Sequence, residues 1–324
     1  MSRVLERLDE IYAIGRHRGG YSPEEDAAHA LAATWMREAG LQVSTDDARN
    51  LFGRRGDARV WAGSHLDSVP TGGKYDGVLG VVAAIEAANR LPDAPLAVVA
   101  FRAEETGPRG SKRLEALPDA YLELHIEQGP VLERANEPLG IVTAIAGAAR
   151  GAVIVEGRAD HAGTTPMNVR DDALVAAAQV VLHVRESVPA GAVATVGAVE
   201  VEPNAINVVP ARVTVSVDAR SADAAVLDRL VQQIGFEPTS RIEPTVMSGL
   251  PLEALRAVLP DAPELVSGAG HDAMVLAAAG VPTAMLFVRS LNGGISHHPD
   301  ELSSAEDIEL AVVALTDALS RIAR

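Results

Sequence analysis

Two short stretches of the chain hold the residue types that bind divalent cations. The string GSHLD spans residues 63–67 and leads to YDG at 75–77, and the acidic pair Glu104-Glu105 comes after an apolar run. Together they place an imidazole and several carboxylates at the ends of two predicted buried strands. These groups are sufficient to ligate two cations and to leave one carboxylate free as a base. The sequence therefore indicates a metallohydrolase.

His65 and Asp67 lie two positions apart on a predicted strand, so their side chains point to the same face. One can bind a metal while the other accepts the second ring proton. The alternative is a histidine at a strand end that is satisfied by a local carboxylate. Asp76 lies in a glycine-rich loop, where Asp-Gly is ordinarily a turn. Its place at the start of a predicted helix also allows a carboxylate that bridges two cations.

Glu104 and Glu105 follow the apolar residues 96–101. Adjacent side chains project differently, so one glutamate can ligate a metal while the other stays free as a base. Paired acids on a solvated surface are common and need no such role. The strand before them favours a function, because the carboxyl ends of parallel strands face the binding crevice.

Three further histidines, His125, His161 and His297, lie in polar segments punctuated by glycine or proline. A lone histidine is more often structural than catalytic, but histidines in such junctions are harder to explain by packing. Three others are assigned to the protein surface, namely His17, His29 and His183.

The bulk composition sets limits on the class of protein. The 324 residues are enough for two domains, and 48% of them are hydrophobic, which supports a sizeable core. The net charge of −16 disfavours nucleic acid and anionic membranes as partners. There is no cysteine, so any metal must be held by His, Asp and Glu. The start lacks an apolar signal core and no run is long enough to span a membrane, so we expect a cytoplasmic enzyme.

The first part of the chain predicts an α/β domain. Helical spacing and capping signals predict helices over 3–14 and 23–39, and a short strand follows at 41–43. A strand over 60–65, a helix over 78–90 and a strand over 96–101 form a βαβ unit. We therefore expect a mixed, mostly parallel sheet flanked by helices.

The pattern changes near Gly147. Strands are predicted over 150–157, 192–200 and 211–218 and near Ile242, with helices over 171–186 and 223–234. This β-α-β-β-α-β order predicts a small ferredoxin-like α+β domain with two helices on one face of an open sheet. From about Ser248 the α/β pattern returns, with a helix over 271–279, a strand over 282–288 and a helix from 304. We expect a discontinuous catalytic domain, 1–147 with 248–324, and an inserted lid domain, 148–247.

Seven strings in the chain resemble one family when they are taken in order. They are GSHLDSVPTGGKYDG, the EE pair, ELHIEQGPVLE, GRADHAGTTPMNVRDDA, PNAINVVPARVTVSVDAR, SGAGHDAM and GISHHPDE. Together they resemble the hydantoinase/carbamoylase branch of the M20 metallopeptidase-like amidohydrolases. That branch includes N-carbamoyl-L-amino acid hydrolases, β-ureidopropionases and allantoate amidohydrolases. The resemblance covers about residues 22 to 310.

The resemblance implies a role for each matching residue. Two divalent ions, which could be Mn, Zn, Co or Ni, would be held by five ligands, with Asp76 bridging them. Glu104 would be the general base and Asp67 would orient His65. A metal-bridging hydroxide would attack a ureido or amide carbonyl. The implied metal ligands are His65, Asp76, Glu105, His125 and His297.

The middle domain would be the family's lid and dimerisation domain. His161 would reach the partner's active site in a homodimer and stabilise the oxyanion, while Asn207 and Arg220 would bind the substrate carboxylate. Gln128 and His271 are further candidates for substrate contact. The implied substrate is a small ureido or amide carboxylate, of the N-carbamoyl-amino acid or allantoate type.

The chain departs from the family pattern in one respect. Glu105 and His125 are only 20 positions apart, whereas relatives are expected to have several tens of residues more there. Two other functions stay open. One is an M20 aminopeptidase or N-acyl-amino acid hydrolase, although the histidine of HIEQG favours the carbamoylase branch. The other is a non-catalytic binding protein, against which the full ligand set and Glu104 argue.

Overall fold

The computed structural model of the protein describes residues 3–324, and the chain divides into two compact units. The larger unit comprises the chain up to Ile145 together with Val246–Arg324, and the smaller unit is Ala146–Thr245. The observed divisions after residues 145 and 245 compare with predicted divisions after 147 and 247. Residues 1 and 2, which the predicted first domain includes, lie outside the described part of the chain.

A mixed sheet forms the centre of the larger unit, in the order β1-β2-β4-β3-β5-β16-β6-β14, with β15 paired to β6. Within residues 3–324 its strands are β1 (Gln42–Thr45), β2 (Leu51–Arg54), β3 (Val60–His65), β4 (Leu96–Phe101), β5 (Ala120–Ile126), β6 (Leu139–Ile145), β14 (Thr245–Val246), β15 (Glu264–Ser267) and β16 (Thr283–Val288). The four neighbours β4, β3, β5 and β16 are parallel. The pairs β1–β2, β2–β4 and β16–β6 are antiparallel. Parallel pairing therefore joins the four central strands, and β15 also pairs with β6 in parallel.

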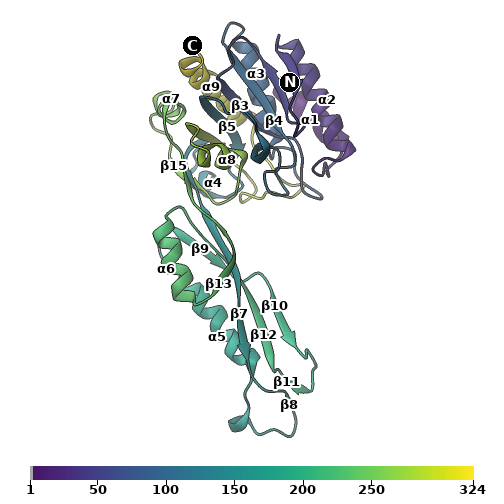
Figure 1. The fold of residues 1–324 in the computed structure, drawn as a ribbon, viewed down its shortest axis with the longest axis vertical. Coiled ribbons are helices and arrows are strands. Elements are labelled where there is room, and N and C mark those ends of the chain that lie inside the picture. Colours follow the sequence, from purple (N-terminus) through teal and green to yellow (C-terminus); the bar gives the residue numbers. More distant parts are fainter. Residues whose placement is uncertain (1–2) are drawn as a thin grey trace. The chain divides into compact units, whose positions relative to one another are not determined.

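Helices cover this sheet, as Figure 1 shows. They are α1 (Arg3–Ile14), α2 (Pro23–Glu38), α3 (Val78–Arg90), α4 (Val131–Ala135), α7 (Leu250–Val258), α8 (Asp272–Ala278) and α9 (Ala305–Ile322). The crossover helix α3 contacts β3, β4 and β5, and it is buried along most of its length. An apolar helix of this kind between two parallel strands is what holds the βαβ unit together. No helix within residues 3–324 is long and apolar enough to cross a membrane.

Helix α2 shows how local sequence sets an element and where the prediction was wrong. Ser22 caps the helix by accepting the N–H of Glu25, and Pro23 occupies the first turn. His29 was assigned to the surface, but it is only 6% exposed. It lies on the buried face with Glu25 and Met36, where three of the apolar residues between them are alanines and the fourth is Trp35. A stripe of small residues gives a weak periodic signal, and this hid the buried face.

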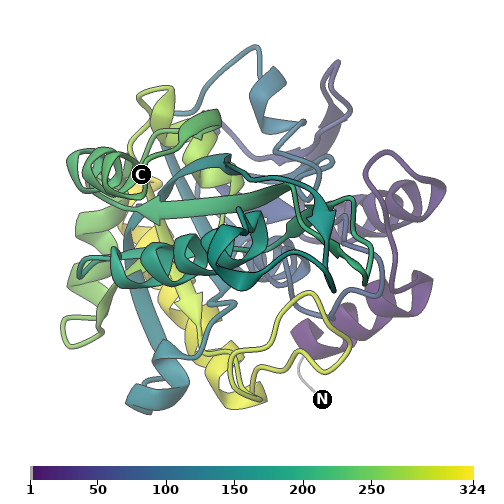
Figure 2. The same cartoon turned by 90° about the horizontal axis from the view of Figure 1, so that it is seen from below.

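The smaller unit is a five-stranded antiparallel sheet with two helices. Its order is β10-β12-β7-β13, and β9 also pairs with β12. The elements are β7 (Gly147–Glu156), β8 (Asp160–His161), α5 (Ala173–Glu186), β9 (Ala192–Thr195), β10 (Val199–Glu202), β11 (Val208–Val209), β12 (Arg212–Ser221), α6 (Ala224–Ile234) and β13 (Glu237–Ile242). Helices α5 and α6 contact β7 and β12, and Figure 2 shows α5 running beside these strands.

One predicted strand of the smaller unit, 192–200, is in fact two strands. β9 pairs with the end of β12 at residues 218–221, whereas β10 pairs with its beginning at 212–215. Gly197 lies in the break between them. A glycine within an apparent strand is a common mark of such an interruption.

Candidate metal centre

The carboxyl ends of two parallel strands bring the predicted site residues together. His65 is the last residue of β3 and pairs in register with Phe101, the last residue of β4. Glu104 and Glu105 are the third and fourth residues after this strand end. His125 lies on β5, the other parallel neighbour of β3. The sequence placed His125 in a polar junction, and this was wrong, because it is a buried strand residue.

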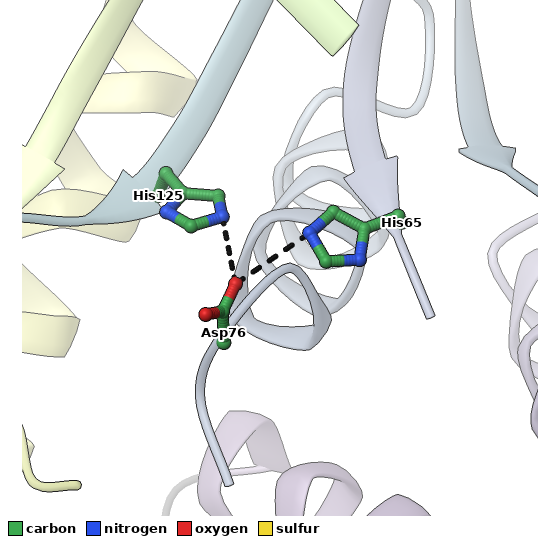
Figure 3. Close-up of side chains that lie close together, drawn as sticks. All are labelled: His65, Asp76 and His125. Carbon is green, nitrogen blue, oxygen red and sulfur yellow. Dashed lines mark ion pairs between the residues drawn. The ribbon is translucent and has the colours of Figure 1, made fainter. Parts of the chain in front are cut away.

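Asp76 lies at the centre of the site, with a different set of side chains at each of its carboxylate oxygens. Its Oδ1 is 3.1 Å from Nε2 of His125 and 3.5 Å from Nε2 of His65 (Figure 3). Its Oδ2 is 3.4 Å from Nε2 of His297, which in turn lies 3.4 Å from Oε2 of Glu105. In each of the two groups the potential ligand atoms lie within 4.8 Å of one another. All five predicted metal ligands are thus brought together in two groups that share Asp76.

The two buried histidines present the same ring nitrogen to Asp76. Nδ1 of His125 lies 2.9 Å from the carbonyl of Ile126, and Nδ1 of His65 lies 3.2 Å from Oδ1 of Asp67. The protonated ring donates from Nε2 to Asp76, whereas in the neutral imidazole a proton on Nδ1 satisfies both contacts and leaves the lone pair of Nε2 directed at the centre. This is the tautomer that a metal-ligating histidine needs. The donor set of imidazoles and carboxylates therefore fits divalent ions such as Zn, Mn, Co or Ni.

The electrostatics of the site favour positive charge. Burial would raise the pKa of Asp76, but hydrogen bonds from His125, His297 and His65 outweigh it and hold the pKa well below its usual range. Burial would lower the pKa of His65, yet the neighbouring carboxylates of Asp67 and Asp76 raise it well above its ordinary value. The hydrogen bond to Asp76 raises the pKa of His297 to about 9. A field that stabilises imidazolium also stabilises a bound cation.

Gly77 gives His65 the space to reach Asp76. It precedes helix α3 with φ of +65°, a conformation that glycine adopts without strain. A Cβ at this position would overlap the imidazole ring of His65. The glycine of the YDG string is therefore required both by the backbone turn and by the close approach of the ligand.

Asp67 connects the histidine to the acidic pair. The sequence predicted that Asp67 orients His65, and the 3.2 Å contact agrees with that role. In addition, its two carboxylate oxygens accept the backbone N–H groups of Glu104 at 3.0 Å and Glu105 at 3.1 Å. One fully buried carboxylate therefore fixes the ring of His65 and the turn that carries both glutamates.

Glu104 lies on the buried side of the centre. Its Oε2 is 3.8 Å from Nε2 of His65, and the residue is 8% exposed. Burial raises its pKa well above the ordinary value, and the charge of His65 opposes this only in part. Burial and the charge of Asp76 raise the pKa of Glu105 to about 7. A carboxylate with a raised pKa that is close to a reacting water has the properties of a general base.

The backbone just before the acidic pair is in an unusual conformation. Ala103 has φ of +53°, which costs an L-residue roughly 1–2 kcal/mol. The buried carboxylate of Glu25 accepts its N–H at 2.9 Å, and a Cβ on Gly20 would overlap Ala103. The start of α2 thus supports the turn that presents Glu104.

The family follows from comparison with known proteins. The chain matches the profile of Peptidase family M20/M25/M40 over residues 61–321, which is more than half of its length. The chain belongs to this family. M20 proteins are metal-dependent, which agrees with the two groups of candidate ligands.

The relatives include enzymes of the branch that the sequence resembled. The chain is 34% identical to N-carbamoyl-L-amino acid amidohydrolase of Geobacillus stearothermophilus, over 99% of this chain and 98% of that protein. It is 34% identical to allantoate amidohydrolase of Bacillus subtilis, with 94% and 92% covered. A hydantoinase/carbamoylase family amidase from Burkholderia ambifaria has the same fold, with a TM-score of 0.92, 30% identity and 100% and 97% covered. The resemblance is confirmed, and this M20 protein is an amidohydrolase.

This M20 protein is shorter than its relatives. The alignment to the Geobacillus enzyme spans 404 positions, about 80 more than the 324 residues of this chain. In this structure the connection from β4 to β5 contains only a short 3-10 turn, Ser111–Arg113. Ser111 donates to the buried carboxylate of Asp272 at 2.6 Å, and Asn50 donates to the carbonyl of Gly110 at 3.0 Å. The short connection is therefore anchored at both of these points.

Two predicted substrate contacts of this M20 protein lie against the ligands. Nε2 of Gln128 donates to Oδ2 of Asp76 at 2.7 Å. His271 is buried, its ring packs edge-on against His125 at 4.5 Å between centroids, and its Nε2 lies 2.8 Å from the hydroxyl of Ser267. Burial and the charge of His125 lower the pKa of His271 well below its usual value. His271 is therefore a neutral neighbour of the ligand group formed by His65, Asp76 and His125.

Three predicted site residues belong to the smaller unit. His161 on β8 and Asn207, just before β11, lie on paired segments, and the N–H of Ala162 donates to the carbonyl of Asn207. Arg220 lies near the other end of the unit, where its guanidinium makes two hydrogen bonds to Asp218 at 2.8 and 3.0 Å. Along β12, Arg212 and Arg220 are eight positions apart, which corresponds to roughly 26 Å. Within one copy of this unit, His161 and Asn207 are therefore far from Arg220.

Sequence reasoning missed several buried polar residues around the centre. Glu123 accepts the hydroxyl of Ser64 at 2.7 Å and the N–H of Ala273 at 2.8 Å, which joins β5, β3 and α8. The alternation of Glu123 and His125 in ELHIE could have indicated that both face the site. Glu301 and the half-buried Ser296 lie in the string GISHHPDE, of which only His297 was assigned.

Proposed function

We propose that this M20 protein is a two-metal amidohydrolase that cleaves the C–N bond of a ureido group in a small carboxylate of the N-carbamoyl-amino acid or allantoate type. The proposal rests on one observation above all. The two oxygens of Asp76 face two separate ligand groups, and a buried glutamate lies beside one of them. The activities named for the two amidohydrolase relatives support the choice of a ureido substrate.

Glu104 has the central chemical role in this proposal. Two bound cations would polarise the substrate carbonyl and lower the pKa of a water molecule. Glu104 then accepts the proton of that water as it attacks the carbonyl carbon. Asp67 accepts the N–H of Glu104 and so holds the backbone that carries this base beside His65. Glu104 finally passes the proton to the leaving nitrogen.

The bond changes balance with one water molecule. For an N-carbamoyl-amino acid, addition of water breaks the bond between the carbonyl carbon and the nitrogen of the amino acid. The amino acid leaves with the proton from Glu104, and the other product is carbamic acid, which separates into ammonia and carbon dioxide. Ammonia release therefore distinguishes this reaction from the cleavage of an acyl amide.

His161 has the hydrogen-bonding geometry of an oxyanion donor. Its Nδ1 accepts the N–H groups of Gly163 at 3.0 Å and Thr164 at 3.2 Å. This places the ring proton on Nε2, which is free to donate to a developing negative charge. Because Arg220 lies far from His161 in one copy of the smaller unit, we propose that the two serve one substrate only when a second copy supplies His161 and Asn207.

The exposed face of α5 supports assembly through the smaller unit. Leu174, Val175 and Leu182 on this helix are 41%, 61% and 58% exposed. Val175 and Leu182 lie seven positions apart, about two turns, and Leu174 is adjacent to Val175, so the three share one side of the helix and make an apolar stripe in the isolated chain. We propose that this stripe forms part of a homodimer interface and that the smaller unit is both lid and dimerisation domain.

A substrate panel tests the reaction. The protein is stripped with chelator, reloaded with Mn, Co, Ni or Zn, and offered allantoate, N-carbamoyl-L-amino acids and N-carbamoyl-β-alanine, with N-acetyl and dipeptide controls. We expect metal-dependent ammonia release from ureido compounds alone. Cleavage of only the acyl or peptide controls would instead identify an M20 acylase or peptidase.

A complementation experiment tests the shared site. Co-expression of H161A, which leaves Glu104 intact, with E104Q, which leaves His161 intact, produces mixed dimers. If His161 acts on the partner's site, a statistical mixture recovers about one quarter of wild-type activity, because each mixed dimer has one complete site. If His161 acts within its own chain, no dimer has a complete site and the mixture stays inactive.

A further inference from the structure

Glu301 is a buried carboxylate that neither metal chemistry nor proton transfer uses directly. It lies in the loop between β16 and α9 that also carries His297, and it is 5% exposed. Its Oε1 accepts the backbone N–H groups of Tyr75 at 2.7 Å and Asp76 at 3.0 Å, and its Oε2 accepts the hydroxyl of Ser296 at 3.0 Å. All three donors are uncharged. A carboxylate buried among neutral donors is costly, so its retention calls for a specific role.

These hydrogen bonds connect the two loops that meet at Asp76. Tyr75 and Asp76 belong to the loop before α3, whereas Ser296 and Glu301 belong to the loop of His297. The hydroxyl of Ser296 also lies 3.2 Å from Oδ2 of Asp76, on the same side as His297. Glu301 therefore holds the backbone of Asp76 from one direction while its own loop presents a ligand from the other.

Gly73 shows how closely Glu301 fits against the Asp76 loop. A Cβ on Gly73 would overlap the carboxylate carbon, an oxygen and Cβ of Glu301. The loop backbone thus packs directly on this side chain. Gly73 does not have a positive φ, so an alanine there would be opposed by Glu301 and not by its own backbone.

We infer that Glu301 is a positioning residue that fixes Asp76 between the two ligand groups and ties the His297 loop to it. The inference rests on the proposed two-metal centre. Bridging requires each oxygen of Asp76 to face a different group, so a small rotation of its backbone moves both oxygens. The group of Glu105 and His297 is affected more, because Glu301 holds Asp76 and lies in the loop that carries His297. Loss of Glu301 therefore weakens the metal on this side first.

Metal binding to the full-length, metal-free protein tests the inference. Manganese alone is titrated by calorimetry into wild type, E301A, E301Q and G73A, and unfolding is followed in parallel. The control is D307N, which alters another buried carboxylate that pairs with Arg289 and does not touch the Asp76 loop. In E301Q the amide oxygen can still accept both backbone N–H groups, and the amide nitrogen can donate to Ser296.

We expect wild type, E301Q and D307N to bind two manganese ions. We expect E301A and G73A to bind the second ion at least about 10-fold more weakly, as for other groups that orient metal ligands. G73A displaces the carboxylate without removing it, so it decides the matter if E301A fails to fold. Two ions bound with unchanged affinity in G73A and E301A would overturn the inference alone. A wild-type protein that binds fewer than two ions would overturn the two-metal centre and this inference with it.

Discussion

The two ligand groups that share Asp76 differ in how they are held. His65 and His125 are each 1% exposed and lie on the neighbouring strands β3 and β5, where His65 pairs with Phe101 of β4 and His125 with Phe287 of β16 (Figure 3). His297 has a side chain that is 49% exposed, lies in a loop, and has φ of +56°. Its partner Glu105 lies in a turn. One group is therefore positioned by the sheet, and the other depends on hydrogen bonds between loops.

This difference predicts unequal binding of the two ions. A ligand on a buried strand loses little freedom when a metal binds, because its rotamer is already fixed by packing. A ligand on an exposed loop must be ordered at that moment. We therefore expect the ion at His65 and His125 to bind more tightly and to leave last under a chelator.

The largest effect is expected at the acidic pair. E104Q removes a general base and keeps every ligand, so kcat should fall by about 10²–10⁴-fold while both metals remain. The neighbouring variant E105Q removes a ligand and should lose the ion bound by Glu105 and His297. Ammonia release and metal content measured on the same samples separate the two roles. Metal loss in E104Q, or full metal content in E105Q, would contradict the assignment.

The next effect concerns the two histidines on opposite sides of Asp76. H125A should weaken the buried ion by at least about 100-fold, beyond what loss of an outer hydrogen bond costs. H297A should lose the ion bound by Glu105 and His297 but keep the ion bound by His65 and His125. Stepwise chelation followed by elemental analysis measures both. Equal loss of both ions in the two variants would show that the groups are not distinct.

A change at Asp67 should have a smaller effect, which falls on both metal binding by His65 and proton transfer by Glu104. D67N keeps one oxygen acceptor but cannot satisfy His65 and the two N–H groups of Glu104 and Glu105 together. We expect metal affinity or kcat to fall by about 10–100-fold. D307N again provides the control for a buried carboxylate away from the centre. A D67N protein with wild-type kinetics and metal affinity would remove Asp67 from the account.

The smallest effect is on stability and lies outside the centre. Burial lowers the pKa of His29 to about 3, so the folded protein keeps it neutral while the unfolded chain binds a proton below about pH 6.5. Its contribution to stability is thus present above pH 6.5 and declines as the pH falls towards 3, by about 1.4 kcal/mol per pH unit. Burial raises the pKa of Glu25 to about 6. Between about pH 6 and 4.5 the folded protein therefore binds this proton more readily than the unfolded chain does, so Glu25 raises the free energy of unfolding as the pH falls.

Comparison of wild type with H29Q isolates the histidine, because Glu25 is present in both. Urea unfolding at pH 7.5, 6 and 5 should show that wild type loses stability relative to H29Q as the pH falls. Metal content at pH 7.5 should be the same in both proteins. Parallel pH profiles would mean that His29 is protonated in the folded state as well.

Part of the candidate metal centre could be predicted from the sequence. The strand over 60–65, the helix over 78–90 and the strand over 96–101 all occur as predicted, and they bring His65, Asp76 and the acidic pair to one edge. β5 was not recognised, because Glu123 and His125 interrupt its apolar pattern even though both are buried. The polar residues that face the site on β5 thus hid this strand in the sequence.

The hydrogen bonds that support the ligands could not be predicted from the sequence, because they join segments that are far apart in the chain. Glu301 reaches the N–H of Asp76 across 225 positions, and Glu25 reaches Ala103 across 78. No local pattern reports which backbone N–H group a buried carboxylate will meet. The roles of His161, Asn207 and Arg220 came from the resemblance alone, and they remain predictions.

The most direct test of the two-group centre is anomalous diffraction from crystals soaked with manganese and then with zinc. We predict two peaks about 3.5–4 Å apart, one on each oxygen of Asp76. One peak should contact His65 and His125, the other Glu105 and His297, and the second should have lower occupancy at limiting metal. A single peak, or two peaks that do not share Asp76, would contradict the account.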